Sequence, residues 1–224
     1  MIKGVFEQID HSARSVVRAV DSNGVLLAQA SWANYPAPSI PYDISYESAA
    51  GQFAIKCGYI SRAQSYVNDP AQDPLHIVEF PIVSVAGERA GTLSLQRFNF
   101  KGGGTGYSFE DNPQPWDFAG RTYVFRATSY EKAPVQIGFR VEDDGTQTKI
   151  FQAVAERVMI DFCLRWSFVL SDVTDFDACM LRMAFIHWHE DPRIGQIPKK
   201  SREKLWVKDR NKERLALFDP VWGA

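Results

Sequence analysis

One short segment constrains the fold of this chain more than any other feature. Residues 176–188 (FDACMLRMAFIHW) contain good helix formers, neither Gly nor Pro, and almost no β-branched residue, and Pro192 follows shortly after them. Three of the side chains are strongly polar: Asp177, Arg182 and His187. A helix that is apolar around most of its circumference must be enclosed on most sides. At about 20 Å it is too short to cross a bilayer and of the length that would thread a β-barrel.

Ahead of this segment, apolar and polar residues alternate with a period of two over many short runs. Turn residues separate the runs, such as Asn23-Gly24 between 15–20 and 25–32, and the stretch 86–91 between 75–85 and 92–100. The pattern predicts about nine to twelve strands of ordinary length, all antiparallel because the connections are too short for parallel crossovers. Pro81 indicates an edge or a bulge within its strand.

Residues 149–171 are harder to interpret. The apolar side chains of 160–170 fall on one parity over six consecutive pairs, which predicts a strand with one buried face. Residues 149–159 contain Ala and Glu and are compatible with either a strand or a helical turn. Whether the helix 176–188 lies inside a barrel or packs across one end is also open at this stage.

Many antiparallel strands are followed by a particular succession over residues 160–189: an alternating strand, a short Ser/Asp/Thr turn, then Phe-Asp and the apolar helix. This arrangement resembles the tubby C-terminal-like superfamily, which includes the LURP-one-related proteins and the phospholipid scramblases. The resemblance covers about residues 10–190 and implies an all-β fold, with a closed antiparallel barrel of about twelve strands around the hydrophobic helix. We therefore expect a barrel domain over 1–191 and a basic C-terminal arm over 192–224.

The arm differs in charge from the rest of the chain. Residues 192–224 contain nine Lys or Arg and four acidic residues, which gives them a net charge of +5. Because the whole chain has a net charge of −2, residues 1–191 have a net charge of −7. The candidates for binding an anionic lipid surface are Lys199, Lys200, Arg202, Lys204 and Trp206. Alternatively, the arm folds back over the acidic barrel as an intramolecular clasp, or forms a homodimer contact. The clasp ranks first, a membrane second, and nucleic acid last because the chain as a whole is not basic.

Composition excludes several classes of protein. The chain is 45% hydrophobic and 23% charged, as expected for a packed soluble domain. Three widely spaced Cys residues argue against a secreted disulfide scaffold, and the first residues lack the apolar core of a signal peptide, so we expect a cytoplasmic location. No spacing of Cys or His predicts a metal site, and no motif predicts a cofactor. The Gly-rich run 101–106 lacks the order of a phosphate-binding loop, because its Lys comes first.

Two functions follow from these patterns. A barrel filled by its own helix has no room for a central ligand, which favours a non-enzymatic interaction module that binds anionic lipid or a protein partner through exterior loops and the arm. The alternative is a barrel that binds or transforms a small apolar molecule. The candidate lining residues of that cavity are Trp32, Tyr59, Trp116, Tyr123 and Phe139.

Overall fold

The computed structural model describes residues 1–10, 14–33, 43–57, 77–99, 105–108, 116–130, 133–156, 165–190 and 214–223. The elements in chain order are β1 (Ile2–Asp10), β2 (Arg14–Asp21), β3 (Leu26–Ala33), β4 (Ile44–Ser48), β5 (Gly51–Ile55), β6 (Ile77–Ser84), β7 (Arg89–Asn99), β8 (Thr105–Ser108), β9 (Trp116–Phe118), β10 (Arg121–Tyr130), β11 (Ala133–Val141), β12 (Gln147–Glu156), β13 (Arg165–Leu170), a 3₁₀ turn (Val173–Asp175) and α1 (Phe176–Glu190).

Twelve of these strands close into an antiparallel barrel, which confirms the predicted fold class. Neighbours in sequence pair with each other around most of the ring, and β1 pairs with β13 where the two ends of the barrel sequence meet. Strand β7 pairs with β6 on one side, while its other side pairs with β9 near its start and with β8 near its end. The all-antiparallel order follows from the short connections between successive runs.

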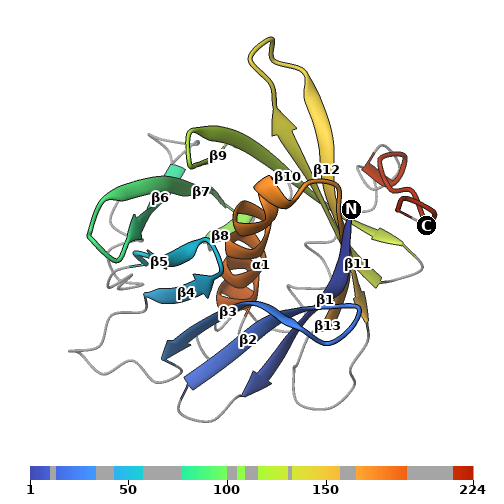
Figure 1. Ribbon diagram of the computed structural model, residues 1–224. Helices are drawn as coiled ribbons and strands as arrows, with labels where there is room; N and C mark the ends of the chain where they lie inside the picture. The colour runs from blue at the N-terminus through green and yellow to red at the C-terminus, as the bar shows by residue number, and fades with distance from the viewer. Residues whose placement is uncertain are drawn as a thin grey trace.

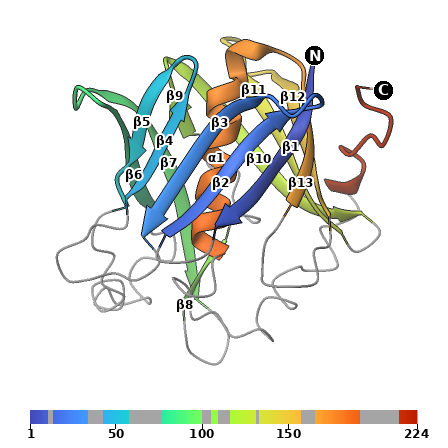
Figure 2. The same cartoon turned by 60° about the horizontal axis from the view of Figure 1, so that its bottom comes forward.

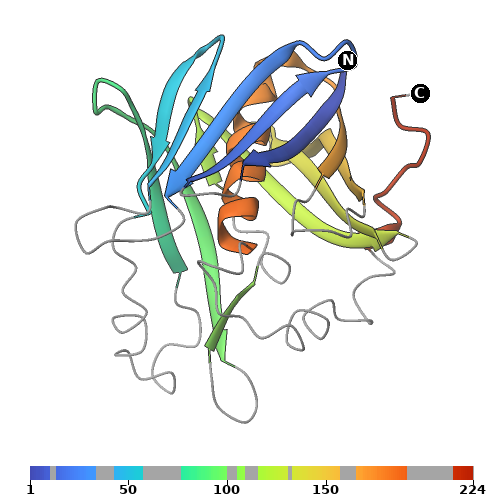
Figure 3. The same cartoon turned by 90° about the horizontal axis from the view of Figure 1, so that it is seen from below.

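Helix α1 lies inside the barrel. Figure 1 looks along the barrel and shows α1 surrounded by strands, and Figures 2 and 3 show it running lengthwise between the walls. Every residue from Phe176 to Trp188 is buried except Asp177, which is partly exposed. The prediction that the strands enclose the apolar helix is therefore confirmed.

The helix does not sit centrally. Its backbone approaches β3 and β4, and the inward side chains of β3 include Ala28 and Ala30, which are small enough to allow this approach. Elsewhere in the core, large side chains fill the barrel: the ring centroid of Phe151 lies 5.8 Å from that of Phe125 and 6.1 Å from that of Phe168. Such pairs contribute beyond the area that they bury.

The strand that the sequence left ambiguous is resolved. Residues 147–156 are strand β12, so the helical alternative is wrong for residues 149–156. In β13, Trp166, Phe168 and Leu170 are buried and the residues between them are not, as the parity predicts. Residues 157–164 lie outside the described part of the chain. The β6–β7 register shifts next to Pro81, between Ile82 and Val83, but the extra residue is Ala90 on β7, so this bulge lies in the partner strand and not in the strand of Pro81.

The start of α1 lies at the same end of the barrel as five tight turns. The turns are those between β2 and β3, β4 and β5, β6 and β7, β9 and β10, and β11 and β12. No helix in the described ranges is both long enough and apolar enough to cross a bilayer.

Candidate functional site

A buried carboxylate fixes the start of α1 to the barrel wall. Asp175 is fully buried at the end of the 3₁₀ turn. Its Oδ1 accepts hydrogen bonds from Arg121 and from the Tyr123 hydroxyl, each at 3.0 Å, and its Oδ2 accepts one from Arg140 at 2.9 Å. Because Arg121 and Tyr123 are on β10 and Arg140 is on β11, one side chain joins the helix to two adjacent strands.

A second carboxylate repeats this arrangement on another strand. The Tyr46 hydroxyl on β4 donates a hydrogen bond of 2.6 Å to Asp177 in the first turn of α1. Burial, followed by the nearby Asp177 charge, raises the pKa of Tyr46 well above its ordinary value. Burial and then Asp175 raise the pKa of Tyr123 in the same way. We call Asp175, Asp177 and the strand residues that bind them the helix latch, because they attach the start of α1 to β4, β10 and β11.

Alkaline unfolding tests the two tyrosines of the helix latch. In the unfolded chain a tyrosine loses its proton near pH 10, with a linkage of about 1.4 kcal/mol per pH unit. Because folding raises both pKa values, their stabilisation is present below that pH and is lost as the pH rises further. Urea denaturation at increasing pH should therefore give a steeper loss of stability above about pH 10 for the wild type than for Y46F/Y123F. The buried thiols of Cys57 and Cys179, whose pKa values burial also raises, contribute equally to both proteins. Equal slopes would contradict the assignment.

The outer face of β11 is buried as well as the inner one. Val135 and Ile137 are 0% exposed and Phe139 is 7% exposed, and they form a cluster separate from the barrel core. The alternate residue Gly138 faces inward, where an added Cβ would come within 3.0 Å of the rings or side chains of Phe125 and Phe151. An apolar outer face on a barrel strand requires a cover from elsewhere in the chain.

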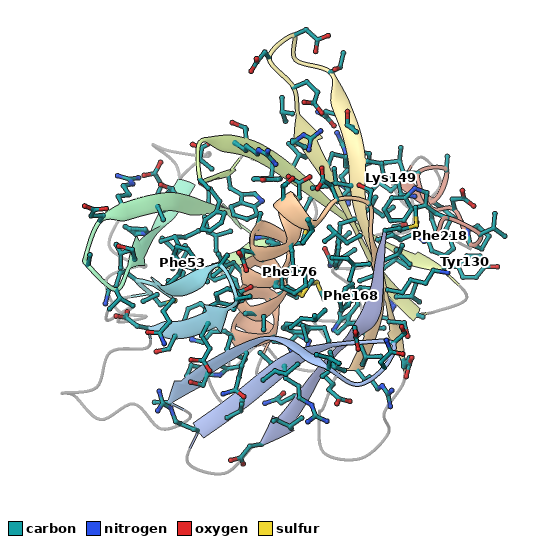
Figure 4. The ribbon with its side chains drawn as sticks, in the orientation of Figure 1. Phe53, Tyr130, Lys149, Phe168, Phe176 and Phe218 are labelled. Atoms are coloured by element: carbon teal, nitrogen blue, oxygen red, sulfur yellow. The ribbon has the colours of Figure 1, made fainter. Side chains whose placement is uncertain are left out.

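Part of that cover is the end of the chain. We call residues 214–223 the strap: Phe218 packs against the outer cluster, and its ring centroid lies 4.7 Å from that of Tyr130 on β10. Figure 4 shows Phe218, Tyr130 and Lys149 together on the outer side of the barrel, away from Phe168 and Phe176 beside α1. The strap therefore attaches to the wall without entering the core.

Polar contacts from β12 fix the backbone of the strap. The Gln152 side chain donates to the carbonyl of Asp219 at 2.9 Å and accepts from its N–H at 3.1 Å. Lys149 donates to the Leu217 carbonyl at 3.0 Å, and its Nζ lies 4.8 Å from the centroid of the Trp222 ring. Burial lowers the pKa of Lys149. Two side chains of β12 thus bind the backbone and one aromatic ring of the strap.

The last described residue of the strap reaches the seam between β13 and β1. Gly223 has a φ of +83°, and a Cβ there would lie 2.5 Å from Val169 on β13 and 2.7 Å from the Met1 sulfur. Only glycine combines this backbone conformation with this close approach. The strap crosses the wall from β10, where Arg214 donates to the Ala127 carbonyl at 3.4 Å, to the seam where β1 and β13 pair.

The intramolecular clasp that the sequence suggests is present for residues 214–223, although not for the electrostatic reason given. The strap contains one basic residue, Arg214, and one acidic residue, Asp219, so its net charge is zero. Apolar packing, hydrogen bonds to its backbone and the contact of Lys149 with Trp222 hold it. The surplus of +5 belongs entirely to residues 192–213, with eight basic and three acidic residues. The candidates Lys199, Lys200, Arg202, Lys204 and Trp206 lie outside the described residues.

The residues proposed to line a ligand cavity do not come together as one. Trp32, Trp116 and Tyr123 are buried in the core cluster that includes α1, and Tyr123 belongs to the helix latch. Phe139 lies on the outer wall, in the other cluster. Tyr59 lies outside the described residues. Sequence reasoning missed Asp175, Gln152 and Lys149, because their partners are distant in the chain.

In the described part of the chain, neither a metal-binding cluster nor a comparison with known proteins adds a residue to the candidate site. Within the ranges that the structure describes, no three His, Cys, Asp or Glu residues are grouped so that they could hold a metal ion. No protein-family model, curated protein or solved structure matches the chain.

Proposed function

We propose that this chain is a non-enzymatic interaction module that binds anionic membrane surfaces through the basic segment 192–213. The observation that carries the proposal is the burial of α1 from Phe176 to Trp188 inside the closed barrel. Since α1 and the aromatic core fill the interior, a partner must bind on the outside. The basic residues of the segment, including Lys199, Lys200, Arg202 and Lys204, supply the charge, and Trp206 supplies an interfacial aromatic ring.

The attachment of the basic segment supports this proposal. Residues 191–213 connect the end of α1 to the strap, whose first residue binds β10 at Ala127. The basic segment is attached at two places, the end of α1 at Glu190 and the contact with Ala127. Glu190 lies about 22 Å along α1 from the helix latch, and Ala127 lies about 20 Å along β10 from it. Both places are therefore toward the barrel end opposite the latch. Acidic residues gather in or close to the turns at the latch end: Asp21, Glu88, Asp117, Glu142, Asp143, Asp144 and Asp172. An anionic surface would attract the end of the barrel that carries the basic segment and repel the latch end.

The resemblance to the tubby C-terminal-like superfamily points in the same direction. We propose membership on the basis of the barrel and its enclosed helix, and a cytoplasmic location where anionic lipid is abundant. Function resides in sites and not in the fold itself, so the experiment is directed at the basic segment.

Sedimentation with vesicles of phosphatidylserine and phosphatidylcholine tests the proposal on the full chain. Each basic residue near the surface contributes about 1 kcal/mol, so K199Q/K200Q should weaken binding by about 30-fold, and added salt should weaken it further. The matched control is K3Q/R89Q, which removes two exposed charges from the latch end and should have little effect. Absence of pelleting, or an equal loss in the control, would overturn the proposal.

A further inference from the structure

The outer wall beneath the strap has the features of a peptide-docking site. The Gln152 amide both donates to and accepts from the backbone of one residue, Asp219, as a neighbouring strand would. Hydrogen bonds to the main chain of a peptide give affinity, while contacts with its side chains give selectivity for its sequence. Here the selective contacts are Phe218 beside Tyr130 and Trp222 over Lys149, two aromatic side chains four residues apart. We call Tyr130, Val135, Ile137, Phe139, Lys149, Gln152 and Val154 the docking strip.

The contacts of the strap are separable from those that hold α1. Phe218 packs against the outer cluster, whereas α1 belongs to the core cluster. The described contacts of the strap therefore join it to the outside of the wall, and its exchange for an identical segment would leave the enclosed helix in place. The strap is also neutral, so its docking does not depend on the basic segment before it.

We propose that the docking strip also accepts the strap of a second copy of this chain. Twenty-three residues, 191–213, connect α1 to the strap. Fully extended, they span about 75 Å, which is several times the length of α1. Such a connection permits docking on the chain's own wall or on that of a neighbour. Reciprocal exchange preserves every contact of the strip, which is why segment swapping is an accessible route to dimers.

The same connection sets the balance between the two arrangements. Because the connection tethers the strap to its own barrel, the effective concentration of the strap at its own strip is of the order of mM. In dilute solution the strap therefore occupies its own strip, and docking between chains becomes measurable when the intramolecular arrangement is disabled. This inference does not rest on membrane binding and can be tested without lipid.

A complementation experiment with two full-length variants provides this condition. K149A/Q152A has a damaged strip and an intact strap, and F218A/W222A has an intact strip and a damaged strap. Sedimentation velocity should show each variant alone as a monomer and their equimolar mixture as a dimer joined by one intact strap and one intact strip. A chain carrying all four substitutions, mixed with either variant, should remain monomeric.

Folding must be monitored separately, because both variants alter the cover of the outer wall. Circular dichroism and a cooperative thermal transition report whether each barrel is intact, and the single variants Q152A and W222A replace the doubles if one of them fails to fold. A mixture of folded variants that stays monomeric up to about 1 mM, the order of the tethered concentration, would overturn the inference. Dimerisation that persists when both partners carry the damaged strap would overturn it too.

Discussion

Replacing Asp175 with Ala should destabilise the protein by about 3 kcal/mol, the lower end of the range for breaking a buried ion pair. The carboxylate is fully buried and binds two guanidinium groups and one hydroxyl, from two strands. The loss falls at the lower end because the side chains of Arg121 and Arg140 are 42% and 23% exposed and can regain water. For a chain of this size the melting temperature should fall by about 6 to 12 °C, measured by calorimetry.

The matched control is D143A. Asp143 is an exposed acid in the turn after β11, on the same end of the barrel. Its removal should change the free energy of unfolding by less than about 0.5 kcal/mol. If D175A and D143A melted together, the helix latch would not fix α1 to the wall. D175N should lie between them, since the amide keeps one acceptor oxygen but loses the charge.

The sequence contains enough information for the barrel and its enclosed helix. Period-two alternation and short connections predict antiparallel strands, and a helix with so little polar surface as 176–188 must be enclosed. These are local properties, and each is visible within about ten residues. The attachment of the helix is different. The partners of Asp175 lie 35 to 54 residues earlier in the chain, which is beyond the reach of a local pattern.

Strand β11 shows where alternation fails. The pattern Val135, Ile137, Phe139 identifies one apolar face, and such a face is ordinarily assigned to the core. In the structure this face points outward, and the inward face includes Gly138, whose lack of a side chain leaves room for Phe125 and Phe151. Alternation gives the two faces but not which one is inside, and part of the cover of this face comes from Phe218, some eighty positions later. No local pattern could predict that contact.

The second large effect concerns the filled interior. Phe185 is fully buried, and its ring centroid lies 4.9 Å from that of Phe80 and 5.5 Å from that of Trp188. F185A should lower the free energy of unfolding by about 3 to 5 kcal/mol, because the lost contacts leave a cavity that the packed wall cannot fill. F185L is the matched control and should lose much less, since it retains most of the buried volume.

The cavity in F185A also distinguishes the two functions that the sequence left open. An apolar cavity of this kind stays dry and binds molecules of the size of benzene. Benzene should therefore raise the melting temperature of F185A and leave that of the wild type unchanged. A ligand stabilises the folded state only if that state has room to bind it. Equal stabilisation of the wild type would mean that the barrel already accommodates a small apolar molecule beside α1. The binding of such a molecule would then replace the exterior surface as the better account of this protein.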